Sequence, residues 1–331
     1  TGEGELILSS SGTTGRSKLV RRDVGALMAV GHQVRQATGL GTSDRVLLPV
    51  ALGHSYGIDM LFGTLVSGAA LEIGQGLHPV ELLRRARDAT ILPAVPFLIE
   101  AFASLEPPRT GRLRLVFSAG APLPEQVRSR FESRWGLGVG DLYGATELGT
   151  VAFRSPSEAP GHVGWALDGV RLEILDPESD EATSGQEGEV AIEAPSMFRG
   201  YLGEGDHPGG PWRTGDLGRI DPSGALHLTG RLKFVIECGG IKVNPMEIEA
   251  VLTSHPRVRE AIVVPLRVSE TVNRLQAFVV SNDDVGSKDL ESFMRTRLAM
   301  VKVPRRFTFV ESLPKTPGGK VLRSAFSEVT V

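Results

Sequence analysis

The sequence contains very little cysteine: one residue, Cys238, among 331. A single thiol cannot form a disulfide within the chain or supply the ligands of a zinc ribbon, so both kinds of stapled fold are excluded. The scarcity of thiols also favours a reducing compartment, and we expect a cytoplasmic location. No apolar run is long enough to cross a membrane as a helix.

Positive charge is not in excess either. The chain carries 36 Lys and Arg against 39 Asp and Glu, a formal net charge of −3. Nucleic acids and anionic membrane surfaces are recognised largely through basic side chains, so neither is an expected partner. The length and a hydrophobic content of 41% instead allow a large core and two domains.

The first half of the chain alternates short apolar runs with amphipathic stretches. This alternation favours a parallel sheet with helices on its faces. We expect strands over residues 6–9, 46–50, 70–73, 90–92, 113–118 and 139–142, and helices over residues 24–37, 58–66, 80–86, 97–105 and 124–135.

The pattern changes near residue 166. Strands and turns over about 166–230 predict a small β subdomain, and a helix at 290–298, with Ser287 as its N-cap, belongs to a later mixed region. The expected fold class is therefore α/β. A large domain over 1–232 combines an α/β body with the β subdomain, and a hinge joins it to a smaller, mobile C-terminal α+β domain over 233–331.

Residues Ser9–Lys18 read SSSGTTGRSK and follow a short apolar run. The glycines allow consecutive backbone N–H groups to converge on an anion, the hydroxyls add donors, and Lys18 adds positive charge. The G-x-x-x-x-G-K-[ST] pattern of a Walker loop is absent. From the residues alone, a phosphate-binding loop and an ordinary solvated turn both stay open.

Polar residues recur at other glycine-flanked turns. In LYGATELG, Thr146 stands beside Glu147, an oxygen pair that suits a hard cation such as Mg²⁺ but that also fits the cap of a helix. In WRTGDLGRI, Asp216 fits either a ribose ligand or a turn former. In LPKTPGGKVLR, Lys320 follows two glycines, as in a solvated loop or in a lysine presented on a flexible tip.

The order and spacing of these pieces resemble the adenylate-forming (ANL) superfamily, which includes acyl- and aryl-CoA synthetases, from Leu6 to Arg323. The resemblance implies an AMP-forming acid–thiol ligase. ATP and Mg²⁺ would activate a carboxylic acid to an acyl-adenylate, and the acyl group would then pass to CoA. Two alternatives stay open: transfer to the phosphopantetheine arm of an acyl carrier protein and, in another class, a catalytically silent binding or scaffold module.

The resemblance also implies roles for particular residues. Lys320 would contact the carboxylate and the α-phosphate, Thr146 the α-phosphate, and Glu147 the Mg²⁺ ion. Asp216, assisted by Arg231, would bind the ribose. The nucleotide would be held further by two groups, the phosphate loop (Ser10, Ser11, Gly12, Thr13, Thr14 and Lys18) and the adenine site (Gly120, Ala121, Pro122 and Tyr143).

Other positions concern motion and assembly. Lys233 matches the family's hinge, and Gly239 and Gly240 match its thiol channel. Rotation about that hinge would exchange the Lys320 tip for the thiol channel between the two half-reactions. Compared with typical relatives, we expect a shortened N-terminal region, and hypothesise that self-association buries the sheet flank it leaves exposed.

The segment ALGHSYGIDMLFGTLVSGA resembles the family's acid pocket. Relatives that activate amino acids place an Asp where this chain has Ser55. A neutral hydroxyl cannot compensate for a buried ammonium, so we expect an acid without an α-amino group. His54 matches a gate position. An apolar wall suited to an aryl or medium acyl chain is expected from Tyr56, Val95, Pro96, Phe97, Ala119, Gly144 and Ala145.

Overall fold

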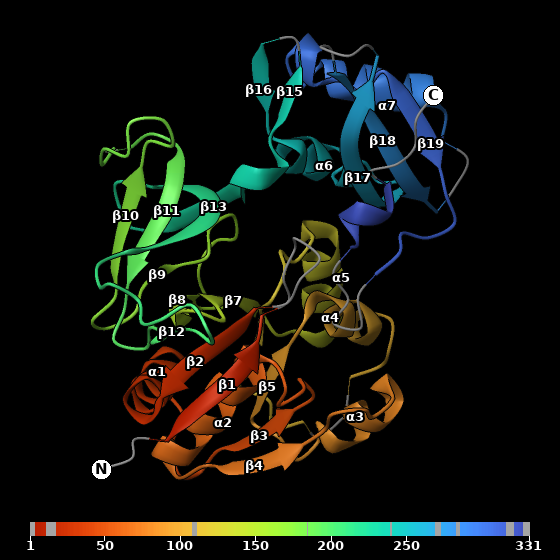
Figure 1. Cartoon of the computed structure of the whole chain (residues 1–331). Coiled ribbons are helices and arrows are strands. Elements are labelled where there is room, and N and C mark those ends of the chain that lie inside the picture. The colour runs from red at the N-terminus through yellow and green to blue at the C-terminus, as the bar shows by residue number, and fades with distance from the viewer. Residues whose placement is uncertain are drawn as a thin grey trace. The chain divides into compact units, whose positions relative to one another are not determined.

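The computed structural model in Figure 1 describes residues 4–10, 18–107, 111–183, 185–238, 240–268, 273–282, 285–315 and 321–326. The chain divides into two compact units. The larger comprises Thr1–Leu123, Val127–Thr214 and Gly218–Leu228, and the smaller comprises Pro124–Gln126, Gly215–Leu217 and Thr229–Val331. Among the described residues, no helix combines the length and apolar character needed to cross a bilayer.

A seven-stranded sheet with the order β4-β3-β5-β6-β7-β8-β9 forms the centre of the larger unit. The pairs from β4 to β7 are parallel, as the alternation predicted, whereas β8 and β9 add on as antiparallel strands. The strands are β3 (Arg45–Leu48), β4 (Ala70–Ile73), β5 (Ile91–Ala94), β6 (Leu115–Ser118), β7 (Val139–Ala145), β8 (Gly149–Arg154) and β9 (Trp165–Ala166).

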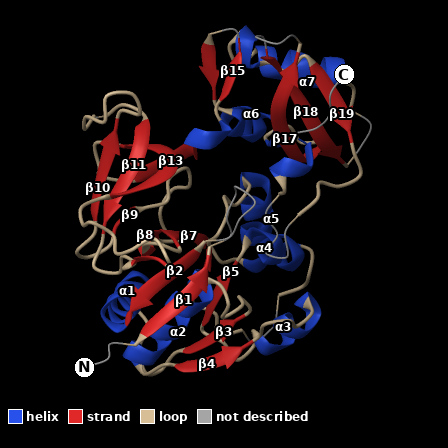
Figure 2. Cartoon of the chain, in the orientation of Figure 1, coloured by secondary structure: helices blue, strands red, loops and turns tan. Residues whose placement is uncertain are grey.

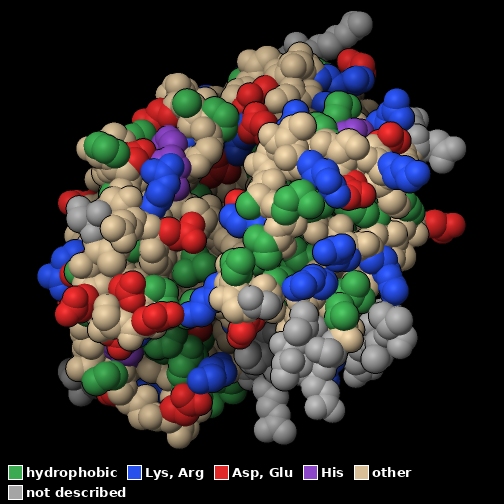
Figure 3. Space-filling model, turned by 90° about the horizontal axis from the view of Figure 1, so that it is seen from above, with side chains coloured by type: hydrophobic (Ala, Val, Ile, Leu, Met, Phe, Trp, Pro, Cys, Tyr) green, Lys and Arg blue, Asp and Glu red, His purple; other side chains and the backbone are tan. Residues whose placement is uncertain are grey.

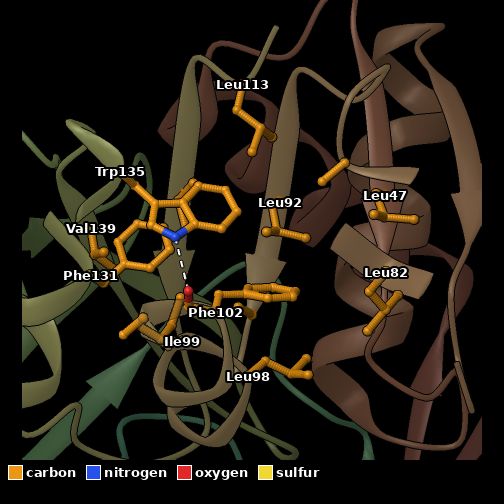
Figure 4. Close-up of a cluster of buried hydrophobic side chains, with 14 of the residues drawn as sticks. Leu47, Leu82, Leu92, Leu98, Ile99, Phe102, Leu113, Phe131, Trp135 and Val139 are labelled. Carbon is orange, nitrogen blue, oxygen red and sulfur yellow. Dashed lines mark hydrogen bonds between the residues drawn. The ribbon is translucent and has the colours of Figure 1, made fainter. Parts of the chain in front are cut away.

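Helices cover both faces of this sheet, coloured blue in Figure 2. The helices are α1 (Val24–Thr38), α2 (Ser55–Ser67), α3 (Pro79–Arg85), α4 (Pro96–Ala103) and α5 (Glu125–Trp135). One core joins α1 and α2 to the sheet through Val30, Val34 and Met60. The core on the α3–α5 side appears in Figure 4, where the Trp135 indole N–H donates to the Phe102 carbonyl at 3.0 Å.

The first predicted strand does not belong to the parallel sheet, which corrects the expectation for residues 6–9. It is β1 (Glu5–Ser9), and it pairs antiparallel with β2 (Leu19–Asp23), which in turn pairs with β12 (Gly200–Tyr201). β2 was not predicted, because its sequence is LVRRD and the buried Arg22 interrupts the apolar pattern. Ion pairing across the fold, which periodicity cannot detect, makes that burial tolerable.

The predicted β subdomain is a four-stranded sheet with the order β10-β11-β13-β14. Its apolar core, built around Val190, Ile192 and Leu226, is continuous with buried residues of β8 such as Val151. The strands are β10 (Arg171–Leu175), β11 (Gly188–Glu193), β13 (Trp212–Ile220) and β14 (Leu226–Arg231).

The smaller unit contains a three-stranded sheet with the order β17-β18-β19 and a hairpin formed by β15 and β16. The hairpin was not predicted, since strands of three residues are too short to show a period. Ser287 is the first residue of its helix and not the N-cap, which is Gly286. The elements are β15 (Ile236–Cys238), β16 (Ile241–Val243), α6 (Pro245–Thr253), β17 (Val258–Arg267), β18 (Asn273–Ser281), α7 (Ser287–Arg295) and β19 (Arg306–Phe309), with short 3₁₀ turns at Leu232–Phe234, Met300–Lys302 and Arg323–Phe326.

Figure 3 shows one face of the molecule, on which acidic and basic side chains are interspersed. This mixture matches the small net charge of −3.

Candidate active site

Several predicted site residues lie outside the described part of the chain. The remaining predicted residues can be placed, those of each unit separately. The residues outside the description are Ser11, Gly12, Thr13, Thr14, Gly239 and Lys320.

The two ends of the predicted phosphate loop are held together by strand pairing. β1 and β2 run antiparallel up to the pair Ser9–Leu19. Beyond that pair, the Ser10 N–H donates to the Lys18 carbonyl at 2.8 Å, and the Lys18 N–H lies 3.3 Å from Ser10 Oγ. The fold therefore places Lys18 beside Ser10, where the two ends of the predicted loop meet. Its ammonium nitrogen lies 3.3 Å from Glu204 Oε2 and 4.0 Å from the centre of the Tyr201 ring.

Thr146 and Glu147 lie in the turn that joins β7 to the antiparallel strand β8. Because a strand and not a helix follows the turn, the helix-cap interpretation of this motif is wrong. The approach of the two strands is very close at Gly144, where a Cβ atom would lie 2.2 Å from the Gly149 carbonyl oxygen. Only glycine fits there, so this turn depends on the YGAT sequence that precedes Glu147.

A second segment, residues 196–201, holds Glu147 by both its backbone and its side chain. The Ser196 hydroxyl donates to the Leu148 carbonyl at 2.6 Å, and the Phe198 N–H donates to the Glu147 carbonyl at 2.8 Å. The Tyr201 hydroxyl donates to Glu147 Oε1 at 2.9 Å. Burial and the facing Glu147 carboxylate hold the pKa of Tyr201 above its usual value, so the hydroxyl stays protonated.

Sequence reasoning did not identify Tyr201 or Glu204 as neighbours of the site. The stretch FRGYLGEG carries no charge spacing that would relate it to Lys18 or Glu147. An aromatic residue after a glycine, between two turns, was the only local signal, and it is equally typical of an edge strand. Their proximity is a product of the pairing between β12 and β2.

The predicted acid pocket meets the predicted α-phosphate contact at one point. Ser55 is the first residue of α2, and its hydroxyl oxygen lies 3.4 Å from the hydroxyl oxygen of Thr146. His54 is exposed at the N-cap position and makes no side-chain cap there. The ring centroids of Tyr56 and Phe117 lie 6.4 Å apart, and burial raises the pKa of the Tyr56 hydroxyl.

The other predicted pocket residues differ in exposure. Ala119 is buried and Phe97 is exposed, with a fractional exposure of 54%, so the two cannot contribute equally to a closed wall. Val95, Pro96 and Ala145 are half-buried, whereas Gly144 is exposed at the turn.

The segment predicted to face adenine follows the carboxyl end of β6. Gly120 adopts a φ of 86°, which turns the chain sharply after the strand. Ala121 is half-buried and Pro122 exposed. Tyr143 is only 8% exposed and belongs to the core beside Leu148, so little of its ring is accessible in this arrangement.

Asp216 and Arg231, both predicted at the ribose, form an ion pair within the smaller unit. Arg231 Nε lies 2.5 Å from Asp216 Oδ1, and Asp216 is 6% exposed. β13 supplies the carboxylate and the end of β14 supplies the guanidinium. A carboxylate can accept several hydrogen bonds, so the side chain of Asp216 is chemically suited to bind the hydroxyls of a diol.

The predicted hinge and thiol-channel positions lie close together in sequence in the same unit. Lys233 is in the 3₁₀ turn Leu232–Phe234, with its ammonium 5.0 Å from the Phe234 ring. Gly240 lies in the turn of the β15–β16 hairpin and has a φ of 85°. The long C-terminal segment of the smaller unit begins at Thr229. The predicted domain boundary lies a few residues later, between residues 232 and 233.

Glu147 suits a hard cation chemically. Mg²⁺ binds through one or two carboxylates together with the phosphates of its substrate, and it retains several waters. Within the described ranges no group of three or more His, Cys, Asp or Glu side chains forms a complete metal cage. A site with one carboxylate therefore fits an ion that arrives with a nucleotide.

Comparison with known proteins shows which family the chain resembles. The profile of the AMP-binding enzyme family matches residues 6–202, and that of the AMP-binding enzyme C-terminal domain matches residues 247–320. A 2-succinylbenzoate–CoA ligase of Bacillus licheniformis is 30% identical over 328 residues, which cover 96% of this chain and 68% of the relative.

Solved structures of similar proteins are also known. ATP-bound MatB from Rhodopseudomonas palustris superposes with a TM-score of 0.90 at 28% identity, covering 97% of this chain and 67% of MatB. The amide bond synthetase McbA from Marinactinospora thermotolerans superposes with a TM-score of 0.86 at 29% identity, covering 97% of this chain and 69% of McbA. The chain thus spans about two thirds of the length of these relatives.

Proposed function

Because this chain belongs to the AMP-binding enzyme family, we propose that it is an AMP-forming ligase that joins a carboxylic acid to the thiol of CoA. The observation that supports this most directly is the 3.4 Å approach of Ser55 to Thr146. It brings the helix expected to bind the acid to the turn expected to bind the α-phosphate, and the first half-reaction requires those two groups to meet.

In that first step, an oxygen of the acid attacks the α-phosphorus of ATP, the bond to the bridging oxygen breaks, and pyrophosphate leaves. Thr146 donates a hydrogen bond to the α-phosphate, and Lys18 neutralises the departing pyrophosphate. Glu147 would hold Mg²⁺, which supplies charge neutralisation along the phosphates. Catalysis of this kind is mainly positioning and charge stabilisation.

In the second step, the thiol sulfur attacks the acyl carbon, AMP leaves, and the thiol proton passes to solvent or phosphate. Lys233 would serve as the hinge that exchanges the Lys320 tip for the hairpin at Gly240. A site that closes on each half-reaction in turn keeps water from the mixed anhydride.

We propose that the acid lacks an α-amino group and has an aryl or medium acyl body. Ser55 is neutral at the place where a buried ammonium would need a carboxylate. Tyr56, which follows Ser55 in the chain, belongs to the same apolar cluster as Val95 and Ala119. Such an apolar wall favours an acid with an apolar body.

Two assays test the function. Pyrophosphate release with hydroxylamine trapping, over a panel of acids and with Mg²⁺ present, should give a signal for aryl or medium acyl acids and none for amino acids. No signal with any acid would support the silent module instead.

The acceptor assay then compares CoA, a phosphopantetheinylated carrier protein and a small amine. We expect thioester formation with CoA to be fastest. The carrier protein is the alternative thiol, and the amine enters because the similar McbA is an amide bond synthetase.

A further inference from the structure

Tyr201 contacts two charged side chains, Lys18 and Glu147, that lie far apart in the sequence. Its ring lies under the Lys18 ammonium, 4.0 Å from nitrogen to ring centre, a distance at which a cation is attracted to the ring face. Its hydroxyl donates to Glu147 Oε1 at 2.9 Å. One side chain therefore connects the lysine of the first loop to the carboxylate of the β7–β8 turn.

The backbone around Tyr201 is fixed against both of these partners. On one side, the Phe198 N–H donates to the Glu147 carbonyl at 2.8 Å. On the other, the Leu202 N–H donates to the Leu19 carbonyl at 2.8 Å, next to Lys18. The rings of Phe198 and Trp212 pack on Tyr201 with centroids 5.2 and 5.9 Å away. These contacts restrict rotation of the Tyr201 side chain away from Lys18 and Glu147.

Glu204 adds an exchangeable partner for the same lysine. Its carboxylate lies 3.3 Å from the Lys18 ammonium, and the two side chains are 57% and 50% exposed. Exposed pairs of this kind contribute little to stability, so an incoming phosphate can displace the carboxylate. The Glu204 N–H donates to the Tyr201 carbonyl at 3.1 Å, so the turn keeps the carboxylate near the ammonium.

We propose that Tyr201 is a positioning residue for nucleotide binding: its hydroxyl orients Glu147 for the metal ion, its ring positions Lys18 for the phosphates, and Glu204 holds Lys18 until a phosphate replaces it. The inference rests on the proposed function, because it takes Lys18 and Glu147 as the nucleotide and metal ligands. It adds to that function separate roles for the hydroxyl and the ring of Tyr201.

These two roles can be measured by calorimetric titration of ATP into the full chain, once with excess Mg²⁺ and once with EDTA. Tyr201→Phe removes only the hydroxyl, and we expect the Kd with Mg²⁺ to rise about tenfold, as for loss of a hydrogen bond to a charged group. With EDTA the Kd should stay within about twofold. Tyr201→Leu also removes the ring, and should weaken binding about two- to fivefold with EDTA as well.

Two further variants serve as controls. Glu204→Gln removes the competing carboxylate from an exposed site, and we expect ATP to bind about two- to fivefold more tightly in both buffers. Trp212→Phe changes the packing against Tyr201 but leaves the hydroxyl and the lysine contact, and should change neither Kd. Thermal unfolding of each variant shows whether it is folded.

The outcomes separate this inference from the proposed function. If the unaltered chain binds ATP in neither buffer, the proposed function fails. If the unaltered chain binds MgATP but Tyr201→Phe gives equal losses with Mg²⁺ and EDTA, or no loss, the role of the hydroxyl is refuted. If Tyr201→Phe does not fold, weaker or unchanged binding by Glu204→Gln still overturns the exchange of Lys18 between carboxylate and phosphate.

Discussion

At the scale of single residues, the contact between Ser55 and Thr146 leads to a test of the proposed acid pocket. Their hydroxyl oxygens are 3.4 Å apart, so under the proposed function a carboxylate at position 55 would face both the substrate acid and the α-phosphate. Two like charges about 4 Å apart repel by roughly 1–4 kcal/mol between water and a protein surface. Nothing at position 55 opposes a substrate anion in the unaltered chain.

Ser55→Asp should therefore lower the rate of adenylation about ten- to hundredfold. The measurement is pyrophosphate release with the best acid of the panel. Ser55→Asn has the same shape without the charge and should lose much less. Equal losses in the two variants would show that size and not charge matters, and would contradict the placement of the pocket.

At the scale of elements, a buried ion pair joins α2, which contains Ser55, to β2 and β8, which follow Lys18 and Glu147 in the chain. Arg22 of β2 donates to Asp59 of α2 at 2.8 Å, and Thr150 of β8 donates to the same carboxylate at 3.1 Å. Arg22 is fully buried, and its Nε and Nη2 have no hydrogen-bond partner among the described residues. The ion pair holds β2, α2 and β8 together, but two nitrogens of the Arg22 guanidinium make no hydrogen bond within the described part of the chain.

Breaking this pair on one side should be more damaging than replacing it. Arg22→Met leaves a buried carboxylate and should lower the free energy of unfolding by about 3–5 kcal/mol. The double variant Arg22→Met with Asp59→Leu should recover most of that loss, since neither charge remains. Urea unfolding of both variants gives the values. A double variant no more stable than the single one would contradict this account.

A second anchor sits where α1 leads into β3. Asp44 accepts two hydrogen bonds from Arg114, at 2.9 and 2.8 Å, one from the Thr90 hydroxyl at 2.7 Å and one from the Gly41 N–H at 3.0 Å. The Arg114 guanidinium, followed by Thr90, holds the pKa of Asp44 at about 2 despite its burial. The carboxylate therefore ties the starts of β5 and β6 to the end of α1.

This anchor gives stability a pH dependence of known sign. An Asp in an unfolded chain titrates near 3.9, so the lowered pKa stabilises the fold fully above about pH 5 and ceases to do so as pH falls through about 2. Asp44→Asn should lose about 1 to 2 kcal/mol at pH 7, because solvent partly screens Arg114. The difference should shrink in urea unfolding at pH 4 and 3. A difference independent of pH would refute the assignment, and Glu106→Gln, an exposed carboxylate, is the control.

At the scale of the whole molecule, the proposed mechanism assigns different half-reactions to different parts of the C-terminal region. Lys320 would act in adenylation only, and the hairpin that contains Gly240 would act in thioester formation.

Lys320→Ala should lower adenylation about a hundredfold or more, the scale for removing one preorganised charge contact. Thioester formation from a preformed acyl-adenylate and CoA should change much less. Each half-reaction is measured separately, by pyrophosphate release and by thioester yield. An equal loss in both would contradict domain alternation.

Much of the molecule followed from the sequence alone. The parallel sheet and its helices were predicted because apolar periodicity is local, and it survives wherever one face of an element meets one core. Thr146 and Glu147 were singled out from the sequence, but the turn between antiparallel strands that holds them was not predicted, because the same residues also fit a helix cap.

Only the tertiary structure decided the rest. The pairing of β1 with β2 and β12, the burial of Arg22 and the contacts of Tyr201 with Lys18 and Glu147 all join residues far apart in the chain. Local sequence cannot encode such partners, because a buried charge or an aromatic ring is favourable only when a complementary group arrives from elsewhere. The sequence determined the elements and the chemistry they carry, and packing determined which of those groups meet.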